Sequence, residues 1–234
     1  MLPPVHVIDF EGNRAYGIIE YGLVTLENSQ IVAVVCDYCR PQYSPAVAQF
    51  FGHLRFPENT ALTTFADCLS LFKERRQRGV FCAHNATVED RLLCQYDFYC
   101  EPCPTEEIVG EPDKKPYLSE FTGNTSNLKK FLGPTKDSLR FASPSGTAIK
   151  PISWGPWIDT HKIYKKYYPI AKSYGVKALI QHFRLEKKLE NLAHKYDRGQ
   201  KLSFHTALYD ALATTLLLQN FIDLFRVNDV QFLL

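Results

Sequence analysis

The chain has 234 residues, of which 45% are hydrophobic and 22% charged, and its formal net charge is +2. A chain of this length is long for a single hydrophobic core and short for two independent ones, so we predict a single domain with an insertion. The high aromatic content excludes global disorder, and no apolar run reaches the length of about 18 residues that spans a membrane.

The first forty residues predict a meander of three antiparallel strands. Residues 4–10 form a short apolar run with β-branched side chains, which is typical of a buried strand. Turn residues separate this run from residues 16–26, and those from residues 30–38. The start of the chain has no basic segment and soon reaches Asp9, so we expect a strand there and not a signal peptide.

The rest of the chain alternates between helical and strand patterns. Strands are predicted at residues 80–83 and 154–159. Helices are predicted at residues 62–78, 87–96, 160–168, 176–183 and 204–225. The whole predicts an α/β domain with a five-stranded mixed sheet, three of its strands antiparallel, and helices on both faces.

Residues from about 97 to 153 differ in character from the segments around them. Prolines and glycines punctuate this stretch, and few apolar residues recur with any period. We therefore interpret it as an insertion on a domain that spans residues 1–234, because it lacks the apolar residues for a core of its own.

Positive charge is concentrated after Asp159. Residues 159–203 contain eleven basic residues and four acids, a net charge of about +7 that would suit phosphate groups. A solvated helical surface is the simpler interpretation of such a run. Nearby aromatic side chains could stack on bases, although packing is their commoner role. These aromatic pairs are Trp154 with Trp157 and Tyr167 with Tyr168.

Two carboxylates stand at the end of the first strand. Asp9 and Glu11 are two positions apart, so their side chains project from the same face of the strand. Crowded carboxylates repel one another unless cations neutralise them, and hard divalent cations prefer oxygen ligands. The pair is therefore a candidate metal site, with a simple exit of the strand into solvent as the alternative.

A histidine and an aspartate stand near the start of the last helix. His205 and Asp210 are five residues apart, which on an ideal helix would turn their side chains about 140° from each other. They can converge only if His205 lies at or before the start of the helix, with Ser203 as a possible N-cap. A structural histidine and a buried aspartate with a protein partner are the alternatives.

The segment Ala-His-Asn-Ala-Thr-Val-Glu-Asp-Arg-Leu-Leu runs from a strand end at Ala83 into a helix. Asn85 is a typical cap residue, and an acid in the first helical turn is favoured by the helix dipole. Capping and dipole effects could therefore account for Glu89 or Asp90 without any catalytic role.

In their order along the chain, these three segments resemble the three sequence motifs of the DEDDh 3′–5′ exonuclease family, which includes proofreading subunits and ribonuclease T-like enzymes. Asp9-Phe-Glu11 is similar to the first motif, and the segment around Asn85 to the second. His205 and Asp210 are similar to the third. The stretch IIEYGLVTLENSQIV also resembles the family's second and third strands, and only the insertion lies outside the resemblance.

The resemblance implies a ribonuclease H-like fold and hydrolysis of phosphodiester bonds from the 3′ end of single-stranded DNA or RNA, releasing 5′ mononucleotides. It implies two Mg²⁺ or Mn²⁺ ions, which can clamp the attacking and leaving oxygens of an in-line displacement. The implied ligands are the carboxylates of Asp9, Glu11 and Asp210 together with the second-motif acid. His205 would be the general base, and the basic helices would hold phosphates.

The second motif offers two acids. The family's spacing from Asn85 selects Glu89, although the family normally has aspartate there, and Asp90 follows one position later. Leu92 and Leu93 lie on the same helical face as Glu89. We therefore expect Glu89 to complete the metal site and Asp90, rotated by about 100°, to lean further toward solvent or toward the side of the helix that carries Arg91.

Two departures from the family's pattern keep alternatives open. Gly12 and Asn13 follow Glu11 where the family has threonines, and the second-motif acid is a glutamate. A non-catalytic module that retains the fold and binds nucleic acid or a polymerase is therefore a competing hypothesis. Docking of a polymerase or another protein on the insertion is a further one, and the sequence does not distinguish DNA from RNA.

The chain has seven cysteines, an odd number without a secretory signal, which favours reduced thiols and a cytoplasmic location. Cys36 with Cys39 and Cys100 with Cys103 have the ligand count of a zinc site. However, Cys36 and Cys39 would point to opposite faces of one strand, so we expect free thiols.

Overall fold

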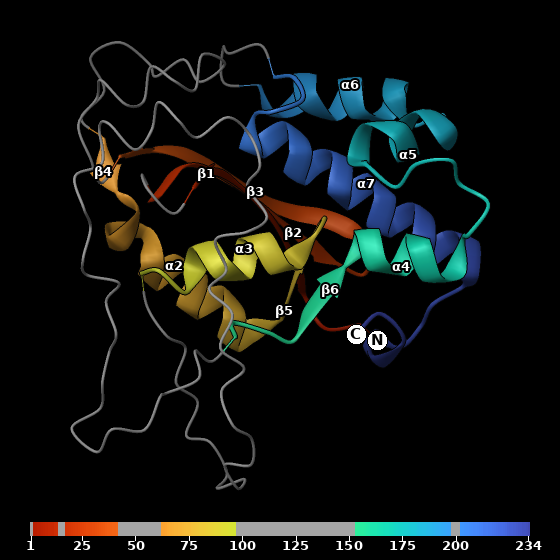
Figure 1. The fold of residues 1–234 in the computed structure, drawn as a ribbon, viewed down its shortest axis with the longest axis horizontal. Coiled ribbons are helices and arrows are strands. Elements are labelled where there is room, and N and C mark those ends of the chain that lie inside the picture. The colour runs from red at the N-terminus through yellow and green to blue at the C-terminus, as the bar shows by residue number, and fades with distance from the viewer. Residues whose placement is uncertain (1, 14–16, 42–61, 97–152, 198–201) are drawn as a thin grey trace, which may run out of the picture. The chain divides into compact units, whose positions relative to one another are not determined.

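In the computed structural model, six strands form one mixed sheet in the order β4-β3-β2-β1-β5-β6 (Figure 1). β1 (Val5–Asn13), β2 (Gly17–Glu27) and β3 (Gln30–Arg40) are antiparallel. β5 (Val80–Ala83) runs parallel to β1, and β6 (Trp157–Asp159) runs parallel to β5. The predicted mixed sheet with three antiparallel strands is therefore confirmed.

The sixth strand was not predicted. β4 consists of the two exposed residues Thr63–Thr64, which pair in parallel with the end of β3. Two exposed threonines carry no alternation of apolar and polar residues, so nothing in the sequence distinguishes β4 from the start of the helix that follows it.

The structure describes residues 2–13, 17–41, 62–96, 153–197 and 202–234, all of which belong to one compact unit. The insertion predicted at residues 97–153 lies outside them except for its last residue, and so do Cys100 and Cys103. None of the described helices combines the length and hydropathy needed to cross a bilayer.

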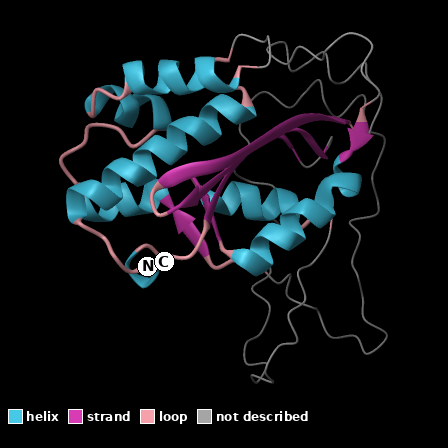
Figure 2. Cartoon of the chain, turned by 180° about the vertical axis from the view of Figure 1, so that it is seen from behind, coloured by secondary structure: helices cyan, strands magenta, loops and turns pink. Residues whose placement is uncertain are grey.

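Helices cover both faces of the sheet (Figures 1 and 2). α2 (Phe65–Arg78) and α3 (Ala86–Leu93) lie on one face, whereas α7 (Ala207–Phe225) packs on β1 and β2 from the other. α4 (Thr160–Tyr167), α5 (Val176–His182) and α6 (Glu186–Tyr196) pack in turn on α7. A short 3₁₀ helix, η2 (Val230–Phe232), lies near the C-terminus.

The alternation of side chains along β1 produces two cores. Val5 and Val7 face α7 in one core, whereas Ile8 and Phe10 face α2 and α3 in the other. Because α7 lies between the sheet and the outer helices, most of its residues are buried and it is apolar almost all round. Cys36 and Cys39 of β3 also fall in different cores, and neither forms a disulfide within the described part of the chain.

α6 was not predicted because its lysines dominate the sequence pattern. Leu185, Leu189 and Ala193 nevertheless recur at helical spacing and are buried against the α7 core. The basic residues in the described part of this stretch are exposed. Of the aromatic pairs, Trp154 is fully buried and stacks on Phe81. Trp157, Tyr167 and Tyr168 are partly buried and pack against the two cores.

Candidate active site

β1 directs Asp9 and Glu11 toward α7. They alternate with Ile8 and Phe10, so they share the face of Val5 and Val7. The antiparallel register places Gly22 of β2 opposite Asp9 and Glu20 opposite Glu11. The acids of β1 thus lie beside a second strand that carries a third carboxylate on the same face.

The N-terminal turn of α7 packs directly on β2. A Cβ added to Gly22 would lie 2.4 Å from the carbonyl oxygen of Ala207, so only glycine permits this approach. Glu20 lies two residues before Gly22 on β2, and its Oε1 accepts a 3.1 Å hydrogen bond from the backbone N–H of Ala207. β2 therefore determines where the first turn of α7 lies.

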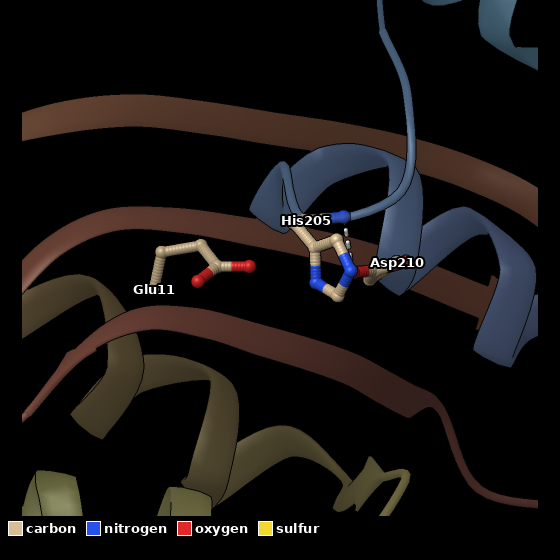
Figure 3. A group of neighbouring side chains, drawn as sticks. All are labelled: Glu11, His205 and Asp210. Atoms are coloured by element: carbon tan, nitrogen blue, oxygen red, sulfur yellow. Dashed lines mark hydrogen bonds between the residues drawn. The ribbon is translucent and has the colours of Figure 1, made fainter. Parts of the chain in front are cut away.

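His205 lies just before this turn. A spacing of five residues requires this position if the side chains of His205 and Asp210 are to converge. Its backbone adopts the left-handed conformation, with a φ of 71°, and its N–H donates a 2.9 Å hydrogen bond to Oδ2 of Asp210. The helix N-cap is Thr206 instead of the expected Ser203. Ligand atoms of Glu11, His205 and Asp210 all lie within 4.8 Å of one another (Figure 3).

The start of α3 is fixed by Asp159 at the end of β6. Its carboxylate accepts hydrogen bonds from the backbone N–H groups of Asn85 at 3.3 Å and Ala86 at 3.2 Å. It also accepts from the N–H of Lys162, as the N-cap of α4. Asn85 is the N-cap of α3 in the left-handed conformation that asparagine tolerates. This connection sets the position of Glu89 one turn later.

Glu89 reaches β1 beyond the point where strand pairing stops. Within the described residues, the pairing of β1 with β5 extends only as far as Val7 with Cys82. Beyond this pair, the Glu89 carboxylate accepts a hydrogen bond from the backbone N–H of Phe10. Glu89 is 5% exposed, and its charge acts on Asp9.

Asp90 faces away from the other acids, toward the chain that leads into β6. Its Oδ1 accepts hydrogen bonds from the Trp154 N–H at 2.7 Å, the Trp157 indole N–H at 2.9 Å and the Ser153 hydroxyl at 3.0 Å. Asp90 is more exposed than Glu89, as expected, but these three donors, which were not predicted, hold its carboxylate. The structure brings Glu89, and not Asp90, to Asp9 and Glu11.

The crowded carboxylates strongly affect one another. Burial, followed by repulsion from Glu89, raises the pKa of Asp9 well above its usual range. Burial likewise raises the pKa values of Glu11 and Glu89, that of Asp210 to about 6 and that of Glu20 to about 7. Such a set is unfavourable when fully ionised unless positive charge is brought to it.

Within the described residues, three carboxylate oxygens of this set are buried without a hydrogen-bond partner. They are Oε2 of Glu20, Oε2 of Glu89 and Oδ1 of Asp210. Buried polar atoms normally have partners, and clustered carboxylate oxygens are the ligands that Mg²⁺ and Mn²⁺ prefer. The unpartnered oxygens of Glu89 and Asp210 therefore fit hard divalent cations, whereas Glu20 is engaged by the Ala207 N–H.

Sequence reasoning missed Glu20. It lies in an apolar run that is buried along nearly its whole length, and a lone acid in such a run was the available signal. A buried acid needs a partner, but the sequence does not reveal that this partner is the backbone of a helix 187 residues away.

No family model and no curated protein matches the chain, but solved structures do. Exonuclease X in complex with 5′ overhanging duplex DNA is 19% identical, with a TM-score of 0.53 over 98% of this chain and 97% of that one. A 3′-exonuclease that recognises the histone mRNA stem-loop 3′ end is 13% identical, with a TM-score of 0.48 over 96% and 83%.

The nuclease domain of 3′hExo, a DEDDh family member bound to rAMP, is also 13% identical, with a TM-score of 0.47 over 96% and 93% of the two chains. The likeness to exonuclease X shows that this chain has the ribonuclease H-like exonuclease fold. The fold expected from the three motifs is therefore confirmed.

Proposed function

We propose that this chain is a metal-dependent 3′–5′ exonuclease of the DEDDh type, which hydrolyses phosphodiester bonds of DNA or RNA and releases 5′ mononucleotides. The observation that carries the proposal is the convergence of Glu11, His205 and Asp210 within 4.8 Å. Asp9 and Glu89 adjoin this group through β1. Two carboxylates from a strand, one from each of two helices, and a histidine correspond to the motif set in the sequence.

The carboxylates of Asp9, Glu11, Glu89 and Asp210 would hold two Mg²⁺ or Mn²⁺ ions. The unpartnered oxygens of Glu89 and Asp210 support this assignment. When bound, the ions supply electrostatic stabilisation of the attacking and leaving oxygens and lower the pKa of water.

His205 would accept the proton of the attacking water as general base. Its side chain is exposed, so substrate and solvent reach it. The imidazole ring lies beside Glu11 and Asp210 (Figure 3). The hydrogen bond between His205 and Asp210 is donated by the backbone N–H of His205. This position beside two carboxylates would suit proton transfer.

The exposed lysines of α4 and α6 would bind the phosphates of a single strand that enters by its 3′ end. Phosphate contacts from lysines carry no sequence information, so we expect weak sequence preference and strong salt dependence. A polymerase or another protein docking on residues 97–153, and a cytoplasmic location, remain predictions from the sequence.

Cleavage of end-labelled single strands tests this function. With 5′-labelled DNA and RNA, Mg²⁺ or Mn²⁺ should give a ladder that shortens from the 3′ end, and EDTA should abolish it. With 3′-labelled strands, the first product should be a labelled mononucleotide. Binding of these strands without divalent-dependent cleavage would instead favour the non-catalytic module.

A further inference from the structure

Glu20 connects the sheet to the helix that carries half of the third motif. It is 4% exposed, and its Oε1 accepts the Ala207 N–H at 3.1 Å. Ala207 is the first residue of α7, and the N-cap Thr206 makes no side-chain hydrogen bond to the helix. The partner of this helix-end N–H is therefore a distant glutamate on β2 and not the usual cap.

The residues that depend on this contact flank it on both sides. His205 lies two residues before Ala207, and Asp210 lies three residues after it, within the first turn of α7. On β2, Glu20 lies opposite Glu11. The Glu20–Ala207 hydrogen bond thus joins the strand pair that carries the first motif to the turn that carries the third.

Gly22 reinforces the same contact, because the backbone of α7 lies directly against it. An added Cβ would lie 2.4 Å from the Ala207 carbonyl oxygen and 2.7 Å from the Leu208 Cα. The backbone of Ala207 is therefore held at its N–H by Glu20 and lies against Gly22 at its carbonyl. A shift of this turn would move His205 and Asp210 relative to Glu11.

We propose that Glu20 is a positioning residue of the active site, which holds the first turn of α7 by accepting the Ala207 N–H and so sets His205 and Asp210 against Glu11. This inference rests on the proposed nuclease function. It assigns Glu20 no contact with substrate, and it requires the oxygen acceptor at that position, not the negative charge.

Two variants of similar length separate the acceptor from the charge. Glu20→Met removes the acceptor and fills the same space, whereas Glu20→Gln keeps an oxygen and removes only the charge. Glu20→Asp keeps the charge but is one methylene too short to reach Ala207, and as the most conservative change it covers the case in which the methionine variant does not fold. Glu27→Gln, on the same strand but exposed, is the matched control.

We expect Glu20→Met and Glu20→Asp to lower kcat about 10- to 100-fold at saturating Mg²⁺ with KM changed less than about threefold, because small displacements of reacting groups are costly. Glu20→Gln should recover most of the lost kcat, and Glu27→Gln should match the wild type. Hydrogen exchange at residues 205–210 should accelerate in the Met and Asp variants more than elsewhere in α7, while the thermal midpoint reports global stability.

Wild-type kcat in Glu20→Asp, or an equal loss in Glu20→Gln and Glu20→Met, would overturn the inference, the second result by showing that the charge is needed. The exchange measurement does not depend on catalysis. If the wild-type protein cleaves nothing, the proposed function is wrong. The positioning role of Glu20 is then also wrong only if hydrogen exchange at residues 205–210 is unchanged in the Met and Asp variants.

Discussion

The backbone N–H of His205 donates a 2.9 Å hydrogen bond to Oδ2 of Asp210, across the start of α7. The two residues are thus connected through the backbone of His205. This contact uses one oxygen of Asp210, and the other, Oδ1, is buried without a partner. Substitution of the His205 side chain should therefore leave the local backbone intact, provided that the new residue accepts a positive φ.

His205→Asn should lower turnover by about 10²- to 10⁴-fold, the usual contribution of a positioned general base. Asparagine tolerates the left-handed conformation found at this position, whereas alanine would add strain to the loss of the base. Single-turnover kinetics and a thermal melt measure the two effects separately. Normal turnover together with a lowered melting midpoint would identify His205 as a structural residue.

Asp9→Asn and Asp210→Asn should each remove nearly all divalent-dependent cleavage while the protein stays folded. Each change removes a charge from the carboxylate set, and the amide oxygen introduced by Asp210→Asn could still accept the His205 N–H. Calorimetric titration with Mn²⁺ should show weaker binding in both variants. Full activity of either variant at saturating Mg²⁺ would contradict the assignment of two ions to this set.

Glu89→Gln and Asp90→Ala should have opposite consequences, although the two acids are adjacent. Glu89 lies against β1, so its variant should lose most cleavage with little change in stability. Asp90 accepts three hydrogen bonds, and their loss should lower the free energy of unfolding by about 1–3 kcal/mol.

Denaturant titration and specific activity of the folded fraction measure these two outcomes. Specific activity within about threefold of the wild type is expected for Asp90→Ala, because the Asp90 carboxylate binds the segment that leads into β6 and lies outside the proposed metal site. A larger loss of activity in Asp90→Ala than in Glu89→Gln would reverse the roles given to the two residues.

The parts of the fold that local pattern determines could be predicted from the sequence. The alternation along β1 directs Asp9 and Glu11 to one face, and the helical phase of α3 separates Glu89 from Asp90. The destination of Asp90 could not be predicted, because its donors, Trp154 and Trp157, come from a segment more than sixty residues later.

The role of β2 depends on tertiary contacts in the same way. The apolar run at residues 16–26, which contains two glycines and one acid, predicts a buried strand, and the structure confirms this strand as Gly17–Glu27. Which backbone approaches Gly22, and which N–H the buried Glu20 accepts, follow only when α7 packs on the sheet. The sequence motifs identify the reacting groups, whereas packing determines what holds them in place.

Glu20→Gln should be more stable than the wild type at pH 8 in EDTA, and the difference should nearly vanish at pH 5. Burial, followed by repulsion from Glu11, raises the pKa of Glu20 from an ordinary 4.5 to about 7 in the folded protein. Between these values the folded state holds a proton that the unfolded state has lost. The stability linked to this proton is complete below pH 4.5 and is lost as the pH rises through 7.

Comparison of the two proteins at each pH isolates this effect. Burial lowers the pKa values of His6 and His84 to about 4, so their contribution is complete above pH 6.5 and falls as the pH decreases toward 4, but it cancels between variant and wild type. The difference in unfolding free energy should grow by on the order of 2 kcal/mol from pH 5 to pH 8. Saturating Mg²⁺ should reduce it, because bound cations offset the repulsion. An equal difference at both pH values would show that the Glu20 carboxyl titrates normally in the folded protein.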